Sequence, residues 1–298
     1  MGIKQIIGRM IPRVVFRARD DWRAMKAAEA EAGGAQMVVS AKGPKSEKAQ
    51  ATVVFVLIYQ QSWDILSGVY ERLLAAGMRV LVLAVPKVMN NEPYDAAVDT
   101  ADRACEDMCR QQGLNFVGAF NRETGEWFDL EAFAPDYVFY SRPYDEQCPE
   151  PYRSNPVSRY AKVCYIPYGY NVAAGLLLES AYRRIFAVNC WRVFVTQDST
   201  LRWTRSYFPY LSRRRPELFQ MLGYSGYDGL AKADCALPSE GFAQVIAWFP
   251  RWVTESDVNS GSHFLQYREA FLAFAAKHPD VLCICLGPIG LQEKVLLK

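Results

Sequence analysis

The sequence predicts an α/β fold built around a parallel, doubly wound sheet. Short runs of β-branched and aromatic residues alternate along the chain with amphipathic segments of helical spacing. A continuous apolar run is typical of a strand covered on both faces, and repeated strand–helix–strand order favours parallel pairing. Of the 298 residues, 51% are hydrophobic and 22% are charged, which suffices for a large core and excludes wholesale disorder.

The alternation begins at residues 52–59 (TVVFVLIY), which we interpret as the first strand. Ser62 is placed to cap the next helix and Gly77 to end it. The second strand is then expected at residues 78–86 (MRVLVLAVP). The same pattern predicts helices over 94–112 and 151–160, and strands over 114–120, 136–141, 162–168 and 192–197.

The first 50 residues have a different pattern, that of a basic amphipathic leader followed by a linker. Apolar residues recur at helical spacing over 3–15, and five basic residues precede the first acid, Asp20. Such a helix can lie on an anionic membrane, so we expect residues 1–19 to bind that surface. The alternative is that its apolar face packs on the protein's own body. Asp20 would cap a second helix that ends at Gly33-Gly34.

A second unit is expected from residue 236 to the end, after a first Rossmann-like domain over residues 51–235. Residues 245–253 (VIAWFPRWV) and 281–286 (VLCICL) favour strands. Between them, residues 261–280 favour a helix with an inward face of Phe264, Tyr267, Phe271 and Phe274. A parallel sheet this small cannot cover both faces, so residues 236–298 are interpreted as the start of a second Rossmann-like domain.

Composition and missing motifs exclude several classes of function. The net charge of +2, from 34 basic and 32 acidic side chains, is too even for a nucleic-acid-binding surface. Eight cysteines without CxxC spacing and two histidines, His263 and His278, favour free thiols and argue against a metal site. The chain has no GxGxxG, GxxxxGK[ST], HExxH or GxSxG motif, so no cofactor is expected. No signal peptide fits, which favours a cytoplasmic protein attached peripherally to the inner face of the membrane.

Several sequence blocks follow one another in order between about residues 52 and 284. They are Gln61-Ser62-Trp63, PDYVFYSRPYD (135–145), YIPYGY (165–170), LGYSGYDGL (222–230), AWFPRWV (247–253) and SHFLQYREAF (262–271). In these blocks the chain resembles the CDP-glycerol glycerophosphotransferase family of teichoic-acid polymerases and primases. The resemblance implies a GT-B architecture, in which an acceptor-side and a donor-side Rossmann-like domain face each other. It also implies transfer of glycerol phosphate, or a related polyol phosphate or sugar, from a nucleotide-linked donor to a membrane-linked acceptor.

The chain departs from the family pattern at two places. Tyr168-Gly169-Tyr170 stands where the family has a histidine-glycine-threonine motif, so the family's proposed base is missing. A phenol with a pKa near 10 is a poor base at neutral pH. The family's arginine-proline-histidine-proline motif should follow Ile284, where this sequence continues Cys285-Leu286-Gly287-Pro288. We therefore expect a chain truncated within its donor domain, either by a frameshift or as a natural short form, with impaired activity.

Two residues are candidates for catalysis. Asp145 follows a predicted strand at its carboxyl end and could accept a proton from an acceptor hydroxyl, or it could instead cap the helix that follows. Tyr168 could hydrogen-bond an acceptor or pack on the sheet. The expected binding residues are Tyr144, Gly169 and Tyr170 for the acceptor and Tyr227, Asp228, Arg251 and Ser262 for the donor. For Arg251 the alternative is a surface ion pair, and for Ser262 a plain helix cap.

Three functions stay open at this stage. The leading hypothesis is a transferase of cell-envelope polymer synthesis with a donor such as CDP-glycerol. A glycosyltransferase that uses a nucleotide sugar is the second, because GT-B folds host many chemistries. The third is a non-enzymatic remnant that binds a membrane or a partner.

Overall fold

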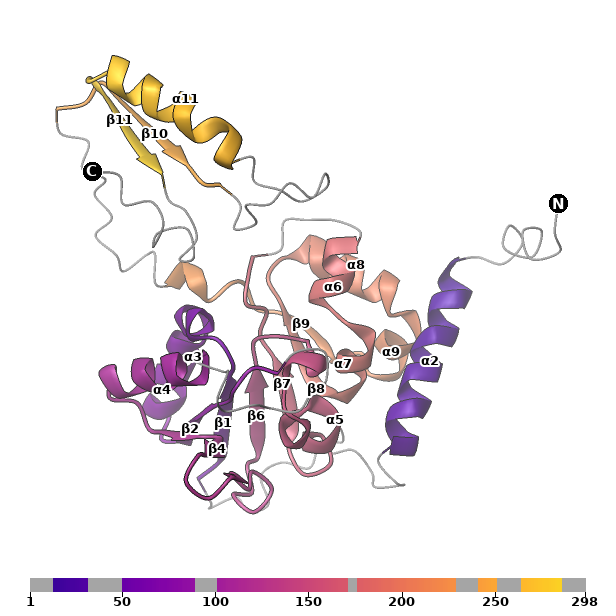
Figure 1. Cartoon of the computed structure of the whole chain (residues 1–298). Coiled ribbons are helices and arrows are strands. Elements are labelled where there is room, and N and C mark those ends of the chain that lie inside the picture. The colour runs from indigo at the N-terminus through magenta and orange to yellow at the C-terminus, as the bar shows by residue number, and fades with distance from the viewer. Residues whose placement is uncertain are drawn as a thin grey trace. The chain divides into compact units, whose positions relative to one another are not determined.

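A computed structural model of the chain describes residues 13–31, 50–88, 101–170, 176–228, 241–250 and 264–285 (Figure 1). The chain divides into two compact units, Met1–Lys232 and Ala233–Lys298, each of which is described by itself. The first unit is built on a seven-stranded parallel sheet, and the second holds a β-α-β unit. The predicted α/β class with a Rossmann-like sheet domain is confirmed.

The seven strands of the first unit have the order β3-β2-β1-β6-β7-β8-β9. All six neighbouring pairs are parallel. The order runs outward from β1 in one direction to β3 and then reverses, since β6 adds on the other side of β1. In open α/β sheets, ligands bind outside the carboxyl ends of the strands at such a switch point. The bounds are Thr52–Leu57 (β1), Arg79–Ala84 (β2), Phe116–Gly118 (β3), Tyr137–Tyr140 (β6), Lys162–Tyr165 (β7), Cys190–Val195 (β8) and Phe219–Met221 (β9).

Both faces of this sheet are covered by helices, as Figure 1 shows. Alternate residues of a strand point to opposite faces. On one face, Phe55 and its neighbours on β1 pack against α3 (Trp63–Ala75) and α4 (Ala101–Gln111). On the other, Val54 and Val56 join a larger core. The elements that contribute to it are α2 (Arg13–Glu31), η3 (Glu150–Tyr152), α5 (Ser154–Val157), α6 (Leu176–Ala181), α7 (Arg184–Asn189) and α9 (Pro209–Arg214), with partly buried residues from α8 (Asp198–Tyr207).

Helix α2 corrects the prediction for the N-terminal segment. Asp20 lies inside this one continuous helix, Arg13–Glu31, and is not the cap of a second helix. The helix packs against α7 and α9 of the same unit, whereas Val15, from the apolar face predicted over residues 3–15, is half exposed. The reason for this packing is the residue after Asp20, Asp21, which is fully buried and bonded to both of those helices. The predicted helix before Arg13 and the Gly33-Gly34 stop lie outside the described residues.

The predicted helix caps and helix ends of the first unit agree with the structure to different degrees. Gly77 ends α3 as predicted, with a φ of +78° that favours glycine and with the amide of Met78 donating to the carbonyl of Leu73. Ser62 precedes α3 but makes no capping hydrogen bond, because it ends a 3₁₀ turn, η1 (Gln60–Ser62), in helical conformation. The predicted helix over 151–160 is two short turns, η3 and α5, since Pro151 and Pro156 interrupt it.

The second unit contains β10 (Gln244–Trp248), α11 (Phe264–Lys277) and β11 (Val281–Cys285), and the two strands are parallel. Trp248 packs on Phe264 and Phe271, with ring centroids 5.3 and 5.0 Å away. Tyr267 and Phe274 of the predicted inward face are exposed, so that part of the prediction is wrong. Across the described parts of both units, no helix is long and apolar enough to cross a membrane.

Candidate functional site

The candidate site lies at the carboxyl ends of β1, β6 and β7, on both sides of the switch point. Pairing between β6 and β7 continues past the strands, because the amides of Ile166 and Tyr168 donate to the carbonyls of Tyr140 and Ser141 at 2.9 and 3.1 Å. This extension places the loop that begins at Arg142 next to Tyr168. Parallel strands bring their carboxyl ends to one edge, so side chains far apart in sequence meet there.

Arg142 is the centre of this group. Its guanidinium carbon lies 3.9 Å from the ring centroid of Tyr59, which follows β1, and 4.5 Å from that of Tyr168. Lys87, which follows β2, has its ammonium 5.4 Å from the same Tyr59 ring. A cation over an aromatic face is attracted by the ring quadrupole, and these contacts fix the position of Arg142. Its buried Nε has no hydrogen-bond partner among the described residues.

Tyr144 and Tyr168 form a hydroxyl pair beside Arg142. Their oxygens are 3.2 Å apart, and either can be the donor. Burial, followed by the hydrogen bond to Tyr168, raises the pKa of Tyr144, against the lowering effect of Arg183 and Arg142. The Tyr144 phenol is therefore protonated at neutral pH and can donate or accept a hydrogen bond but cannot act as a base. Arg183 lies 4.8 Å from the Tyr144 ring centroid and pairs with Glu146.

A second tyrosine group adjoins the ends of β8 and β9. The ring centroids of Tyr224 and Tyr227 are 5.7 and 5.4 Å from that of Tyr170, and the Tyr170 hydroxyl donates to Gln197 at 2.9 Å. The structure thus brings together Tyr170, predicted for the acceptor, and Tyr227, predicted for the donor. Asp228 pairs with Arg72 at 3.2 Å, with both side chains exposed.

Gly169 lies between the two tyrosine groups, and no close contact requires a glycine at this position. A Cβ built at this position would meet no described atom within 4 Å. The space at Gly169 is therefore open, and a small side chain is sterically allowed there.

Asp145 takes a structural position that matches its alternative role as a cap. Both carboxylate oxygens are occupied by Ser154: Oδ1 accepts from its backbone amide at 2.8 Å and Oδ2 from its hydroxyl at 2.5 Å. Asn189 donates to the same hydroxyl oxygen at 2.9 Å. Burial raises the pKa of Asp145, and the bonds from Ser154 oppose that rise. The carboxylate therefore anchors the start of α5, and neither of its oxygens is left without a partner.

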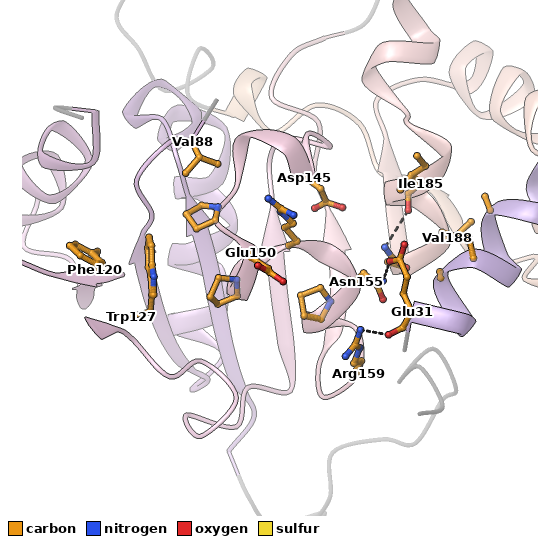
Figure 2. A pocket seen from close by; sticks show the side chains of 18 residues that line it. Glu31, Val88, Phe120, Trp127, Asp145, Glu150, Asn155, Arg159, Ile185 and Val188 are labelled. Atoms are coloured by element: carbon orange, nitrogen blue, oxygen red, sulfur yellow. Dashed lines mark hydrogen bonds between the residues drawn. The ribbon is translucent and has the colours of Figure 1, made fainter. Parts of the chain in front are cut away.

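Asp145 also borders a cavity of about 1160 Å³ on the sheet face covered by α2 (Figure 2). Figure 2 shows Phe120 and Trp127 on one side of this cavity and Glu31, Ile185 and Val188 on the other. Asn155 and Arg159 donate hydrogen bonds to Glu31 at the end of α2. These bonds attach that end of the helix to the rest of the unit.

Two predicted donor residues, Arg251 and Ser262, lie outside the described residues. In the described ranges, no three histidine, cysteine or acidic side chains are grouped so that they could hold a metal ion. Sequence reasoning missed Tyr59, Lys87, Arg142, Arg183 and Tyr224. Each of these follows a strand or begins a helix near the carboxyl edge, but the strand order was needed to show which of them meet.

The comparisons with known proteins support the fold. No family model and no curated protein matches the chain. The chain is similar to a solved structure from Listeria monocytogenes assigned as a UDP-N-acetylglucosamine 2-epimerase, with a TM-score of 0.51 and 11% identity. That match covers 83% of this chain and 65% of the Listeria protein. A UDP-N-acetylglucosamine 2-epimerase from Rickettsia bellii matches with a TM-score of 0.46 and 11% identity, over 83% of this chain and 64% of its own.

The class of protein that follows is an α/β protein with a GT-B-like, Rossmann-type sheet domain, as predicted. The chain spans about 65% of the length of the Listeria structure. At 11% identity the likeness shows the fold alone. The resemblance to the CDP-glycerol glycerophosphotransferase family therefore stays a prediction.

Proposed function

We propose that this chain is the acceptor-side part of a GT-B-type enzyme that acts on a nucleotide-linked sugar or polyol phosphate. The observation that carries the proposal is the Arg142 and tyrosine group at the switch point, where open α/β sheets bind ligands. The fold neighbour from Listeria, which is named for a UDP-linked sugar, supports a nucleotide-linked substrate. In its finer form, the proposal is a transferase that moves glycerol phosphate, a related polyol phosphate or a sugar to a membrane-linked acceptor.

The described residues suit binding and orientation of a polar acceptor. Tyr144 and Tyr168 present hydroxyls that can hydrogen-bond an acceptor. Tyr170, Tyr224 and Tyr227 present aromatic rings on which the apolar face of a sugar or a base can pack. Donor phosphates are assigned to Arg251 and Ser262 of the second unit, by the resemblance. No base is assigned, because both Asp145 oxygens bind Ser154.

Binding of the donor tests this proposal directly. The full chain is titrated calorimetrically with CDP-glycerol, UDP-N-acetylglucosamine, CDP and UDP. We expect one nucleotide-linked compound to bind more tightly than its free nucleotide, because the sugar or polyol part would contact the tyrosine groups. If Tyr168→Ala weakens binding and Tyr267→Ala, at an exposed position, does not, the result would support a binding site at the carboxyl edge of the sheet. If neither linked compound binds, the proposal is wrong.

Turnover then separates the rival functions. Release of CMP from CDP-glycerol, or of UDP from UDP-N-acetylglucosamine, together with a product in which the acceptor carries the glycerol phosphate or the sugar, would mark a transferase. Inversion at C2 of the sugar would mark an epimerase. NMR of the product distinguishes the two. Binding without either reaction would favour the non-enzymatic alternative.

Attachment to an anionic membrane is proposed for the N-terminal segment in a narrower form. Residues 13–19 belong to α2, which packs on α7 and α9, and Arg17 of this stretch lies 5.0 Å from the ring centroid of Tyr207. The proposal therefore rests on residues 1–12, which carry Lys4 and Arg9. Sedimentation with vesicles rich in phosphatidylglycerol at low salt should retain the full chain and release a chain that lacks residues 1–12. Equal retention of the two chains would refute membrane attachment through this segment.

A further inference from the structure

We infer that Arg142 and Lys87 bind a phosphate group of the substrate at the carboxyl edge of the sheet. The inference rests on the proposed function for its place in the reaction and names the chemical class that this part of the site recognises. The residues concerned are called the phosphate cluster and comprise Tyr59, Lys87, Arg142 and Tyr168.

The first argument is charge. Arg142 and Lys87 make no ion pair and no hydrogen bond with any residue that the structure describes. Other arginines of the first unit have carboxylate partners, such as Arg183 with Glu146, Arg184 with Asp21 and Arg192 with Glu217. The two acids closest in sequence to Arg142 are also engaged, Asp145 by Ser154 and Glu146 by Arg183. The cluster therefore offers positive charge that the described carboxylates do not neutralise.

The second argument is the arrangement of the guanidinium. The rings of Tyr59 and Tyr168 contact Arg142 through their faces, so they hold it in place without removing its charge. Its Nε is buried without a hydrogen-bond partner, although an N–H in that state is costly unless a ligand satisfies it. A guanidinium presents parallel N–H donors that match two oxygens of a phosphate.

The third argument is the neighbouring hydroxyls. Tyr144 keeps its proton and bonds Tyr168 at 3.2 Å, so one of the two hydroxyl hydrogens can point at a ligand oxygen. A protonated phenol adds a hydrogen-bond donor without adding a negative charge that would repel phosphate. Lys87 supplies a second cation on a flexible stem, which suits a point contact with an anion.

A purely structural role for Arg142 is the rival explanation. The arginine would then only join the loops after β1, β6 and β7 through its two ring contacts. Arg79 provides a matched control, because its guanidinium carbon lies 4.5 Å from the ring centroid of Phe133 and it begins β2, at the opposite edge of the sheet. A loss of a cation–ring contact alone should affect both variants alike.

The experiment measures binding of phosphates to the full chain by calorimetry at low salt. The probes are glycerol 3-phosphate, the diester glycerophosphoglycerol, and glycerol as the uncharged control. We expect a phosphate probe to bind and glycerol to bind at least 10-fold more weakly, because glycerol lacks the charge. Arg142→Gln should weaken phosphate binding about 10-fold to 100-fold, Lys87→Gln less, and Arg79→Gln should leave it unchanged.

Additional variants and measurements show whether each protein is folded and distinguish between sources of the phosphate group. Arg142→Lys keeps the charge without the planar fork and should retain part of the affinity, and urea midpoints report whether each variant is folded. If Arg142→Gln does not fold, Lys87→Gln and Arg142→Lys decide the result. Vesicles that display phosphatidylglycerol are tested with the full chain and with Arg142→Gln. A lipid headgroup bound at Arg142 would make vesicle binding depend on this residue, whereas a soluble polyol phosphate would make only binding of the diester depend on it.

The inference is overturned if glycerol and both phosphates bind equally, if no phosphate binds, or if folded Arg142→Gln binds as the wild type does. These outcomes differ from failure of the proposed function. Nucleotide-linked compounds that bind while phosphates do not would refute the phosphate cluster alone. Phosphate binding through Arg142 without binding of any nucleotide-linked compound would refute the proposed function alone.

Discussion

Replacing Asp21 by alanine should destabilise the first unit strongly, because this residue connects three helices. Its side chain is fully buried on α2 and accepts a hydrogen bond from Nε of Arg184 on α7 at 2.6 Å. The backbone amides of Tyr210 and Leu211 in α9 also donate to it, at 3.0 and 3.4 Å. Asp21 thus acts as the helix cap of α9 from a position nearly 190 residues away.

The expected cost of Asp21→Ala is about 3 kcal/mol in the free energy of unfolding. Removing one partner of a buried ion pair costs about 3–5 kcal/mol, and the lower end applies because Arg184 is 18% exposed and keeps a bond to the carbonyl of Tyr207. Loss of the cap adds about 1 kcal/mol. The higher helix propensity of alanine stabilises α2 by about 0.5 kcal/mol and so reduces the cost. Burial raises the pKa of Asp21 despite Arg184, so desolvation offsets part of what the pair contributes.

Urea unfolding followed by circular dichroism measures this cost. Asp20→Ala is the matched control, since Asp20 is the preceding residue of the same helix and its side chain is 44% exposed. We expect the control to lie within about 0.5 kcal/mol of the wild type. In a double-mutant cycle with Arg184→Ala, the two changes should be non-additive by about 1–3 kcal/mol. A midpoint for Asp21→Ala equal to that of Asp20→Ala, or strict additivity in the cycle, would refute the reasoning.

Three further predictions follow from buried groups of the first unit. Tyr152→Phe should lower the free energy of unfolding by about 1–2 kcal/mol in urea, because the buried hydroxyl lies 3.0 and 2.8 Å from the carbonyl oxygens of Ala119 and Phe128; an unchanged midpoint would contradict this. Burial raises the pKa of Asp145 above 3.8, so the folded state binds the carboxyl proton more tightly than the unfolded state does. The free energy of unfolding of the wild type, relative to that of Asp145→Asn, should therefore fall as the pH rises from about 4. Parallel plots of unfolding free energy against pH for the two proteins would contradict this. Burial also raises the pKa of the Cys109 thiol to about 11. At pH 8 iodoacetamide should therefore label Cys109 far more slowly than half-buried Cys283, as measured by peptide mass spectrometry. Equal labelling rates would be inconsistent with burial of Cys109.

Strands with a strong local pattern were predictable from the sequence, and elements fixed by distant contacts were not. After Thr52 and Arg79 at their first positions, the runs that form β1 and β2 are continuously apolar, because both faces of these strands are covered. That pattern is visible in a short stretch of sequence. β9 has three residues after a stretch rich in arginine, which is too short for a period to appear. The extent of α2 depends on Asp21, whose partners lie in α7 and α9, and no local pattern encodes such contacts.

The site was predictable in part for the same reason. Tyr144 and Tyr168 were chosen because they lie in sequence blocks that resemble the family, and the structure places their hydroxyls 3.2 Å apart. Arg142 stood in the same quoted block as Tyr144 but was passed over, because its importance comes from Tyr59, which follows the neighbouring β1. That neighbour is known only once β6 is seen to pair with β1 and not with β3.

The topology explains why the cations gather at this point of the sheet. After β1 the chain continues into α3 on one face, and after β6 it continues into η3 and α5 on the other. Two loops that leave adjacent strands toward opposite faces diverge at the sheet edge between them. In this protein Tyr59 comes from the first loop and Arg142 from the second, and their contact bridges the divergence at 3.9 Å. A ring holds the cation there without neutralising it, whereas a carboxylate would have cancelled the charge, and this difference makes an anionic ligand the partner that we expect.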